Sequence, residues 1–136
     1  MTQGFNPLRW RCGKDGCFNQ LRRPKIEVFA GCFPRRINFG DVDGIVELNG
    51  RFCMLEWKGE GGSVHNGQRR SFEAFTRFDG NVVFVVDGDA LTMDVSKFRV
   101  FWRGKQEPEV VGNLEALKAR ITKWADWVQE QDWQAA

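Results

Sequence analysis

The sequence lacks an apolar run long enough to cross a membrane: its longest, Val82–Val86, has five residues, whereas a transmembrane helix needs about 20. Its first residues, MTQGFNPLRWR, lack the apolar stretch of a secretion signal, so we expect an intracellular, cytoplasmic protein without membrane contact. A strong excess of one charge is also missing, because the net charge is only +2. This balance excludes a protein that coats nucleic acid through charge alone. Histidine occurs once, at His65, which leaves a single imidazole that could act as a general base.

The composition is that of one folded domain. A length of 136 residues falls in the usual size range of a single domain, and 42% hydrophobic residues suffice for a core. Residues 1–24 are rich in glycine, asparagine and arginine and predict an irregular arm. We therefore expect a single domain over residues 1–136, in which this arm precedes a core at residues 25–136.

Positive charge is concentrated near the N-terminus. Residues 1–40 have a net charge of +6, and the remainder has −4. Basic side chains interleaved with Trp10 and Phe18 are typical of segments that follow a nucleic-acid backbone. A solvated basic face, or an arm packed on the body, would have the same composition. The candidate nucleic-acid contacts are Arg9, Arg11, Arg22, Arg23, Lys25, Arg35 and Arg36.

Four cysteines leave the question of a metal site open. Cys12 and Cys17, in CGKDGC, resemble half of a zinc knuckle, but Cys32 and Cys53 form no second close pair. Cys53 falls inside an apolar strand pattern, where a buried thiol is ordinary. Reduced, unligated thiols are favoured over a Zn²⁺ ion at Cys12 and Cys17.

A β-hairpin is the most specific local signal. Ile45–Leu48 and Arg51–Trp57 both have strand composition, and Asn49-Gly50 between them is the pair preferred in two-residue turns. Further elements follow from apolar spacing and its boundaries. We expect helices at Gln68–Phe78 and Asn113–Trp133, a fully covered central strand at Asn81–Val86, a strand at Phe98–Trp102, and an extended stretch beginning at Ile37–Phe39. Lys25–Phe33 could form a short helix or a strand, and the helical spacing of its apolar residues favours the helix. Together they predict an α/β domain, with a small mixed β-sheet and flanking helices.

Acidic residues gather at the open end of this hairpin. Asp43 precedes the first strand, and Glu56 and Lys58 lie near the end of the second, on one face because strand side chains alternate. Carboxylates brought together repel unless a cation neutralises them, and oxygen ligands suit Mg²⁺ or Mn²⁺. With a lysine beside it, such an ion could promote phosphodiester hydrolysis. The alternative is a surface ion pair between Glu56 and Lys58, with Asp43 as a turn residue.

The same residues resemble a known motif. Asp43, twelve residues and then Glu56-Trp57-Lys58 are similar to the motif of the PD-(D/E)xK nuclease superfamily, which includes restriction endonucleases and Holliday-junction resolvases. A glycine-bearing loop, Gln68 on a helix and the strand NVVFVV continue the similarity to its VRR-NUC branch and related phage nucleases. The resemblance implies a restriction-endonuclease-like core, Asp43 and Glu56 as Mg²⁺ ligands, Lys58 as the catalytic lysine and Gln68 as an auxiliary catalytic residue. Glu27 would match an acidic residue that completes the site in many members.

Two features depart from the family pattern. Val42 stands where the motif has proline, and Asp41 is a competing metal ligand two residues before Asp43. The arm of residues 1–24 has no counterpart in the family.

These observations predict a metal-dependent nuclease that hydrolyses DNA phosphodiester bonds, with its choice of DNA structure left open. A cutter of both strands would need two active sites and hence a homodimer. The alternative is a non-enzymatic, phage-type inhibitor or accessory protein that binds nucleic acid or protein on a nuclease-like scaffold.

Overall fold

The computed structural model describes residues 26–59 and 62–133. The chain divides into two compact units, Met1–Asp41 and Val42–Ala136. The arm boundary expected after residue 24 lies outside the described residues and stays a prediction.

The described part of the first unit, residues 26–41, contains one short helix. The segment η2 (Ile26–Cys32) is a 3₁₀ helix, so the helical spacing at Lys25–Phe33 predicts the correct class of element but not its tighter form. After it, the Phe39 ring packs edge-on against the rings of Phe29 and Phe33, with centroids 5.8 and 5.2 Å apart. The extended stretch expected at Ile37–Phe39 is not a strand.

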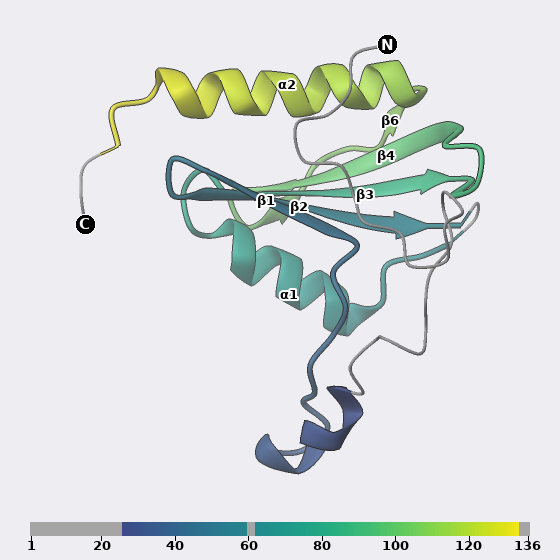
Figure 1. Ribbon diagram of the computed structural model, residues 1–136, viewed down its shortest axis with the longest axis vertical. Helices are drawn as coiled ribbons and strands as arrows, with labels where there is room; N and C mark the ends of the chain where they lie inside the picture. Colours follow the sequence, from purple (N-terminus) through teal and green to yellow (C-terminus); the bar gives the residue numbers. More distant parts are fainter. Residues whose placement is uncertain (1–25, 60–61, 134–136) are drawn as a thin grey trace, which may run out of the picture. The chain divides into compact units, whose positions relative to one another are not determined.

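The second unit is built on a mixed β-sheet (Figure 1). Its strands run in the order β1-β2-β3-β4-β5, and β6 also pairs with β4. The β2–β3 pair is parallel and every other pair is antiparallel. The strands are β1 (Gly44–Leu48), β2 (Arg51–Lys58), β3 (Val82–Gly88), β4 (Val95–Trp102), β5 (Lys105–Gln106) and β6 (Val110–Val111).

The β1–β2 hairpin confirms the turn predicted from Asn49-Gly50. Both residues have a positive φ, of 50° and 80°, as a type I′ turn requires. The Gly50 N–H also donates to the carboxylate of Glu47 over 2.7 Å. The turn fixes a register that pairs Leu48 with Arg51 and Gly44 with Leu55.

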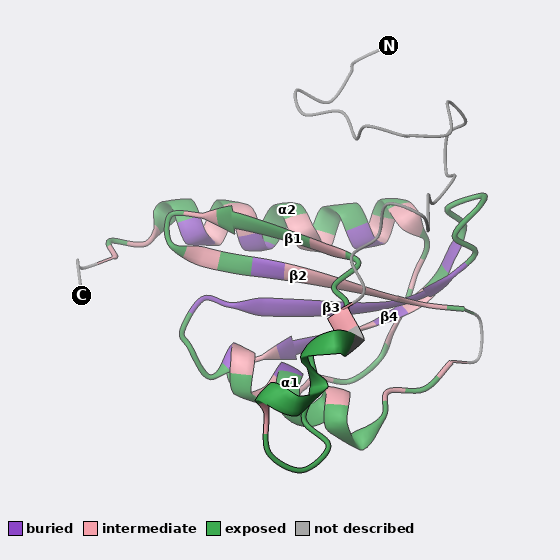
Figure 2. Ribbon diagram, turned by 60° about the horizontal axis from the view of Figure 1, so that its bottom comes forward, coloured by how far each residue is buried: buried purple, intermediate pink, exposed green. Residues whose placement is uncertain are grey.

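Two helices sandwich the sheet (Figure 1). The helix α1 (Asn66–Thr76) joins β2 to β3, and its Phe72 packs on Val83 and Val85. The helix α2 (Leu114–Glu130) covers the opposite face, where Val82, Phe84 and Val86 meet Leu117, Trp124 and Val128. Every residue of β3 is buried, as Figure 2 shows, which confirms the covered central strand. The predicted class of mixed sheet with flanking helices is therefore correct.

Some boundaries differ from the expectation. The helix predicted to reach Phe78 ends at Thr76, whose hydroxyl accepts a hydrogen bond from the Gly104 N–H over 3.1 Å, and Phe78 is 73% exposed. The helix α2 ends at Glu130, and the Trp133 indole folds back to donate to the Val128 carbonyl oxygen over 2.8 Å. The two-residue strands β5 and β6 were not predicted. None of the helices in the described part of the chain is both long and apolar enough to span a bilayer.

We expect the N-cap of α2 to contribute measurably to stability. The Asn113 side chain accepts a hydrogen bond from the Ala116 N–H over 3.0 Å. Asn113→Ala should lower the free energy of unfolding by about 1 kcal/mol in urea denaturation, because an N–H of the first turn loses its partner. Asn113→Ser keeps an acceptor and should stay close to wild type. Equal losses in both variants would contradict the capping role.

Candidate active site

The predicted catalytic residues converge where the parallel strands end and α1 begins. Along β2, Cys53, Leu55 and Trp57 pack on the α2 side of the sheet. Strand alternation therefore directs Glu56 and Lys58 to the α1 side. Gln68 lies in the first turn of α1, which starts after the loop that follows β2.

Glu56, Lys58 and Gln68 form a closed set of polar contacts. The Lys58 ammonium donates to Gln68 Oε1 over 2.7 Å, and Gln68 Nε2 donates to Glu56 Oε2 over 3.0 Å. The third contact, which closes the set, is the ion pair between Lys58 Nζ and Glu56 Oε2, at 3.4 Å. The side chains of Lys58 and Glu56 are only 15% and 14% exposed. Their mutual contacts fix the orientation of the Gln68 amide, with its oxygen toward the cation and its nitrogen toward the carboxylate.

Asp43 lies against the backbone of the same strand. Its Oδ2 accepts a hydrogen bond from the Trp57 N–H, over 2.6 Å, at the residue between Glu56 and Lys58. The β1–β2 register, continued one step beyond the Gly44–Leu55 pair, sets Asp43 opposite Glu56. The structure therefore brings together all four residues predicted to be catalytic. We call this group of Asp43, Glu56, Lys58 and Gln68 the hairpin cluster.

The hairpin cluster offers two carboxylates, those of Asp43 and Glu56, as protein ligands for a metal ion. Within residues 26–59 and 62–133, no three His, Cys, Asp or Glu side chains are grouped so as to hold a metal ion. Asp43 and Glu56 each use one oxygen in the hydrogen bonds above, and no described residue bonds to Asp43 Oδ1 or Glu56 Oε1. Mg²⁺ binds through one or two carboxylates and completes its shell with water and substrate phosphate. The two carboxylates therefore fit Mg²⁺ better than they fit an ion that needs a full protein cage.

A second charged pair beside the cluster was missed from the sequence. Asp87, 2% exposed, lies opposite Lys58 in the backbone register of β2 and β3. Its carboxylate accepts a hydrogen bond from Arg99 Nη2 over 3.0 Å. Lys97 Nζ lies 3.9 Å from the same carboxylate. Arg99 Nη2 also contacts the carbonyl oxygen of Gly62, in the loop after Lys58, at 3.5 Å. The one sequence feature that points to this pair is the position of Asp87 directly after the apolar run Val82–Val86.

The remaining candidates belong to other segments of the chain. Glu27 lies in η2, and its side chain is outside the described residues. Asp41, Arg35 and Arg36 are exposed residues of the Met1–Asp41 unit. His65 is the exposed N-cap residue of α1, and its side chain makes no capping hydrogen bond. Outside the described residues lie Arg9, Arg11, Arg22, Arg23 and Lys25, together with Cys12 and Cys17, so their predicted roles stay predictions.

The chain matches no protein-family model, no curated protein and no solved structure.

The two described cysteines differ in their surroundings, which gives a chemical prediction. Cys32 is exposed, whereas burial raises the pKa of Cys53 from 9.0 to about 12. At pH 8 the Cys53 thiolate should therefore be about a thousandfold scarcer than that of an ordinary thiol, and the thiolate is the reactive form. We expect Ellman's reagent to modify Cys32 in the native protein and Cys53 only after unfolding, as read from tryptic peptides by mass spectrometry.

The same shift links Cys53 to stability at alkaline pH. The folded protein holds the thiol proton more tightly than the unfolded chain does, so this contribution to stability is complete below pH 9 and is lost as the pH rises toward 12. In the test with Ellman's reagent, modification of Cys53 in the folded protein as fast as that of Cys32 would contradict the prediction, because it would show that the thiol is accessible.

Proposed function

We propose that the protein is a metal-dependent nuclease that hydrolyses DNA phosphodiester bonds on a restriction-endonuclease-like core. The single observation that carries the proposal is the closed contact of Glu56, Lys58 and Gln68 beside the Asp43 carboxylate. The alternative given above is a simple surface ion pair between Glu56 and Lys58. Such a pair would not need a third residue from a separate helix to orient both of its partners. The resemblance to the PD-(D/E)xK nucleases attaches to these same four residues.

Each residue of the hairpin cluster has a role that follows from its contacts. Asp43 and Glu56 would hold the divalent ion through the oxygens that no described residue occupies. When bound, Mg²⁺ would polarise the phosphodiester and neutralise charge on the leaving oxygen. Lys58, largely shielded from solvent, would place a compact positive charge against a phosphate oxygen as negative charge develops there. Gln68, which is hydrogen-bonded to both, would hold the Lys58 ammonium and the Glu56 carboxylate in fixed positions relative to each other.

The start of α1 supports phosphate binding at this place. Its first turn contains no acidic residue, and the His65 side chain does not cap it, so no described side chain occupies the N–H groups at the positive end of the helix. Arg69 and Arg70 follow Gln68 and are exposed. These features favour an anionic substrate beside Lys58 and Gln68. The basic residues of the N-terminal segment would extend the contact along the DNA backbone, and the homodimer stays a prediction.

Metal binding provides a test that does not depend on turnover. The free protein should bind Mn²⁺, detected by the loss of the free-ion signal in electron paramagnetic resonance. Glu56→Gln and Asp43→Asn should each weaken binding by about tenfold or more, since each removes one charged oxygen ligand. Glu47→Gln is the matched control, because Glu47 is an exposed acid of the same hairpin that bonds to the turn at Gly50. Equal weakening in all three variants would point to nonspecific attraction of the ion.

Cleavage by the wild-type protein tests the activity itself. A panel of linear, nicked and four-way-junction DNAs should be cut with Mg²⁺ or Mn²⁺ and left intact with a chelator. Lys58→Ala should lower the cleavage rate by about 10²–10³-fold, the usual loss when one preorganised charge is removed from a transition state. Its DNA affinity should change little, because many other basic residues contact the backbone.

The control for this variant is Lys105→Ala, which removes an exposed lysine from β5. It should cut at the wild-type rate. DNA binding without metal-dependent cleavage of any substrate would replace the nuclease by a non-enzymatic binding protein.

A further inference from the structure

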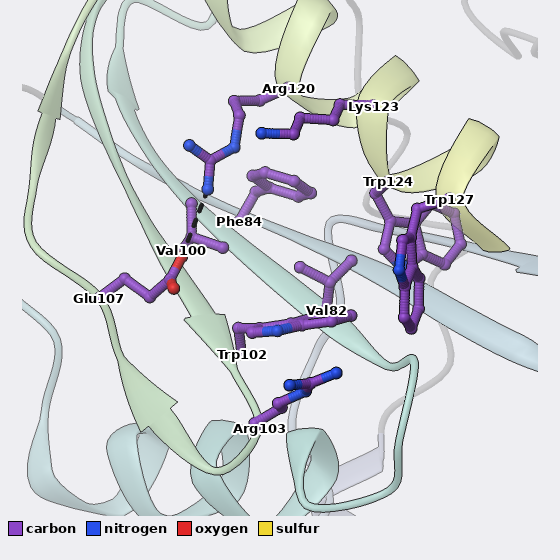
Figure 3. A pocket seen from close by; sticks show the side chains of 10 residues that line it. All are labelled: Val82, Phe84, Val100, Trp102, Arg103, Glu107, Arg120, Lys123, Trp124 and Trp127. Carbon is purple, nitrogen blue, oxygen red and sulfur yellow. Dashed lines mark hydrogen bonds and ion pairs between the residues drawn. The ribbon is translucent and has the colours of Figure 1, made fainter.

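A cavity of about 280 Å³ lies on the α2 side of the sheet (Figure 3). Its wall on the sheet is formed by Val82, Phe84 and Val100, which point away from α1. The hairpin cluster lies on the other face of the same sheet, on β2 and α1. The cavity is therefore a separate feature, and its ligand does not depend on the nuclease proposal.

Indole rings form a second wall of the cavity. Trp102 and Trp127 meet edge to face, with centroids 5.1 Å apart and planes at 80°. The Trp124 N–H donates to the Gly80 carbonyl oxygen over 2.7 Å, which fixes its ring. The indole N–H groups of Trp102 and Trp127 have no partner in the described part of the chain, and neither is among its buried polar atoms without a partner. They are therefore donors open to solvent beside an apolar surface.

The rim of the cavity is positively charged. The lining includes three cations, Arg103, Arg120 and Lys123, but one carboxylate, Glu107, which Arg120 contacts at 3.3 Å. Figure 3 shows Arg120 and Lys123 extending from α2 on one side, with Trp102 and Arg103 on the other. Lys123 has no ion pair within the described residues. Arg103 lies 3.8 Å from the exposed Asp79 and stacks loosely on Trp102, with its guanidinium carbon 5.5 Å from the ring centre.

We propose that this cavity binds a single nucleotide, with the base against the indoles of Trp102 and Trp127 and the phosphate at Lys123. Bases stack on aromatic rings whatever their sequence, and lysine and arginine bind phosphate. The volume lies near the lower end of small-molecule pockets, about 300–1,000 Å³, which suits one nucleotide and is too small for a helix or a peptide strand. The two open indole N–H groups add donors for the acceptor atoms of a base or a sugar. The nucleotide is either free or one unit of a nucleic-acid strand.

A titration of the full chain with adenosine monophosphate tests the site. Isothermal titration calorimetry should show saturable binding, with quenching of tryptophan fluorescence over the same concentration range. Lys123→Ala should weaken the affinity about tenfold, the usual effect of losing one charged hydrogen bond. Lys118→Ala is the matched control, because Lys118 is a 62% exposed lysine of the same helix that pairs with Glu115 at 3.6 Å. It should bind as the wild type does.

Two further ligands separate recognition of a nucleotide from simple attraction of an anion. Ribose 5-phosphate and inorganic phosphate lack the base and should bind at least tenfold more weakly than adenosine monophosphate. Equal affinity of all three, or a Lys123→Ala variant that binds as Lys118→Ala does, would overturn the proposal.

A single-stranded oligonucleotide, added with chelator, identifies the source of the nucleotide. Competition with adenosine monophosphate that Lys123→Ala weakens would indicate a unit of a strand, and its absence a free nucleotide. If neither ligand shows binding that depends on Lys123, the proposal is wrong. Lys58→Ala should bind adenosine monophosphate as the wild type does, so a failure of the nuclease proposal leaves this result unchanged.

Discussion

The parallel pairing of β2 with β3 is the constraint from which the candidate active site follows. A strand cannot return to run parallel to its predecessor through a tight turn, so the chain must cross the sheet between Lys58 and Val82. It does so through α1, which runs back across one face. The beginning of α1 must then lie near the end of β2. Gln68 therefore meets Glu56 and Lys58 although ten and more residues separate them in the sequence.

Strand alternation divides the chemistry between the two faces of the sheet. In β2 the acid and the lysine face α1, while Cys53, Leu55 and Trp57 join the core beneath α2. A shift of the register by one residue would bury both charges, so the Asn49-Gly50 turn is as important to the site as the charged residues are. The same alternation in β3 turns Val83 and Val85 toward α1, and Val82 and Phe84 toward the cavity beneath α2.

Local signals predicted much of this arrangement. The turn and the covered strand each depend on a few neighbouring residues, and each is confirmed. The geometry of Glu56 and Lys58 also follows from local alternation. The Asp87–Arg99 pair could not be foreseen, because it depends on the antiparallel register of β3 and β4. The cavity was equally hidden, since Trp102, Trp127 and the rim cations come from elements that meet only in the folded chain. The strands β5 and β6 are too short to show a period of two.

The ion pair between Lys58 and Glu56 has a thermodynamic consequence for any cation that the cluster holds. The Lys58 ammonium neutralises the charge of Glu56, so the folded protein can keep this carboxylate near Asp43 in the absence of metal. A divalent ion on the other oxygen of Glu56 would be repelled by that ammonium. A phosphate that neutralises the charge of Lys58 would reduce the repulsion, and by linkage each of the two ligands would then raise the affinity for the other. Loading of the ion would in that case be coupled to the arrival of a polyanion, and the free protein would stay largely metal-free when the ion is scarce.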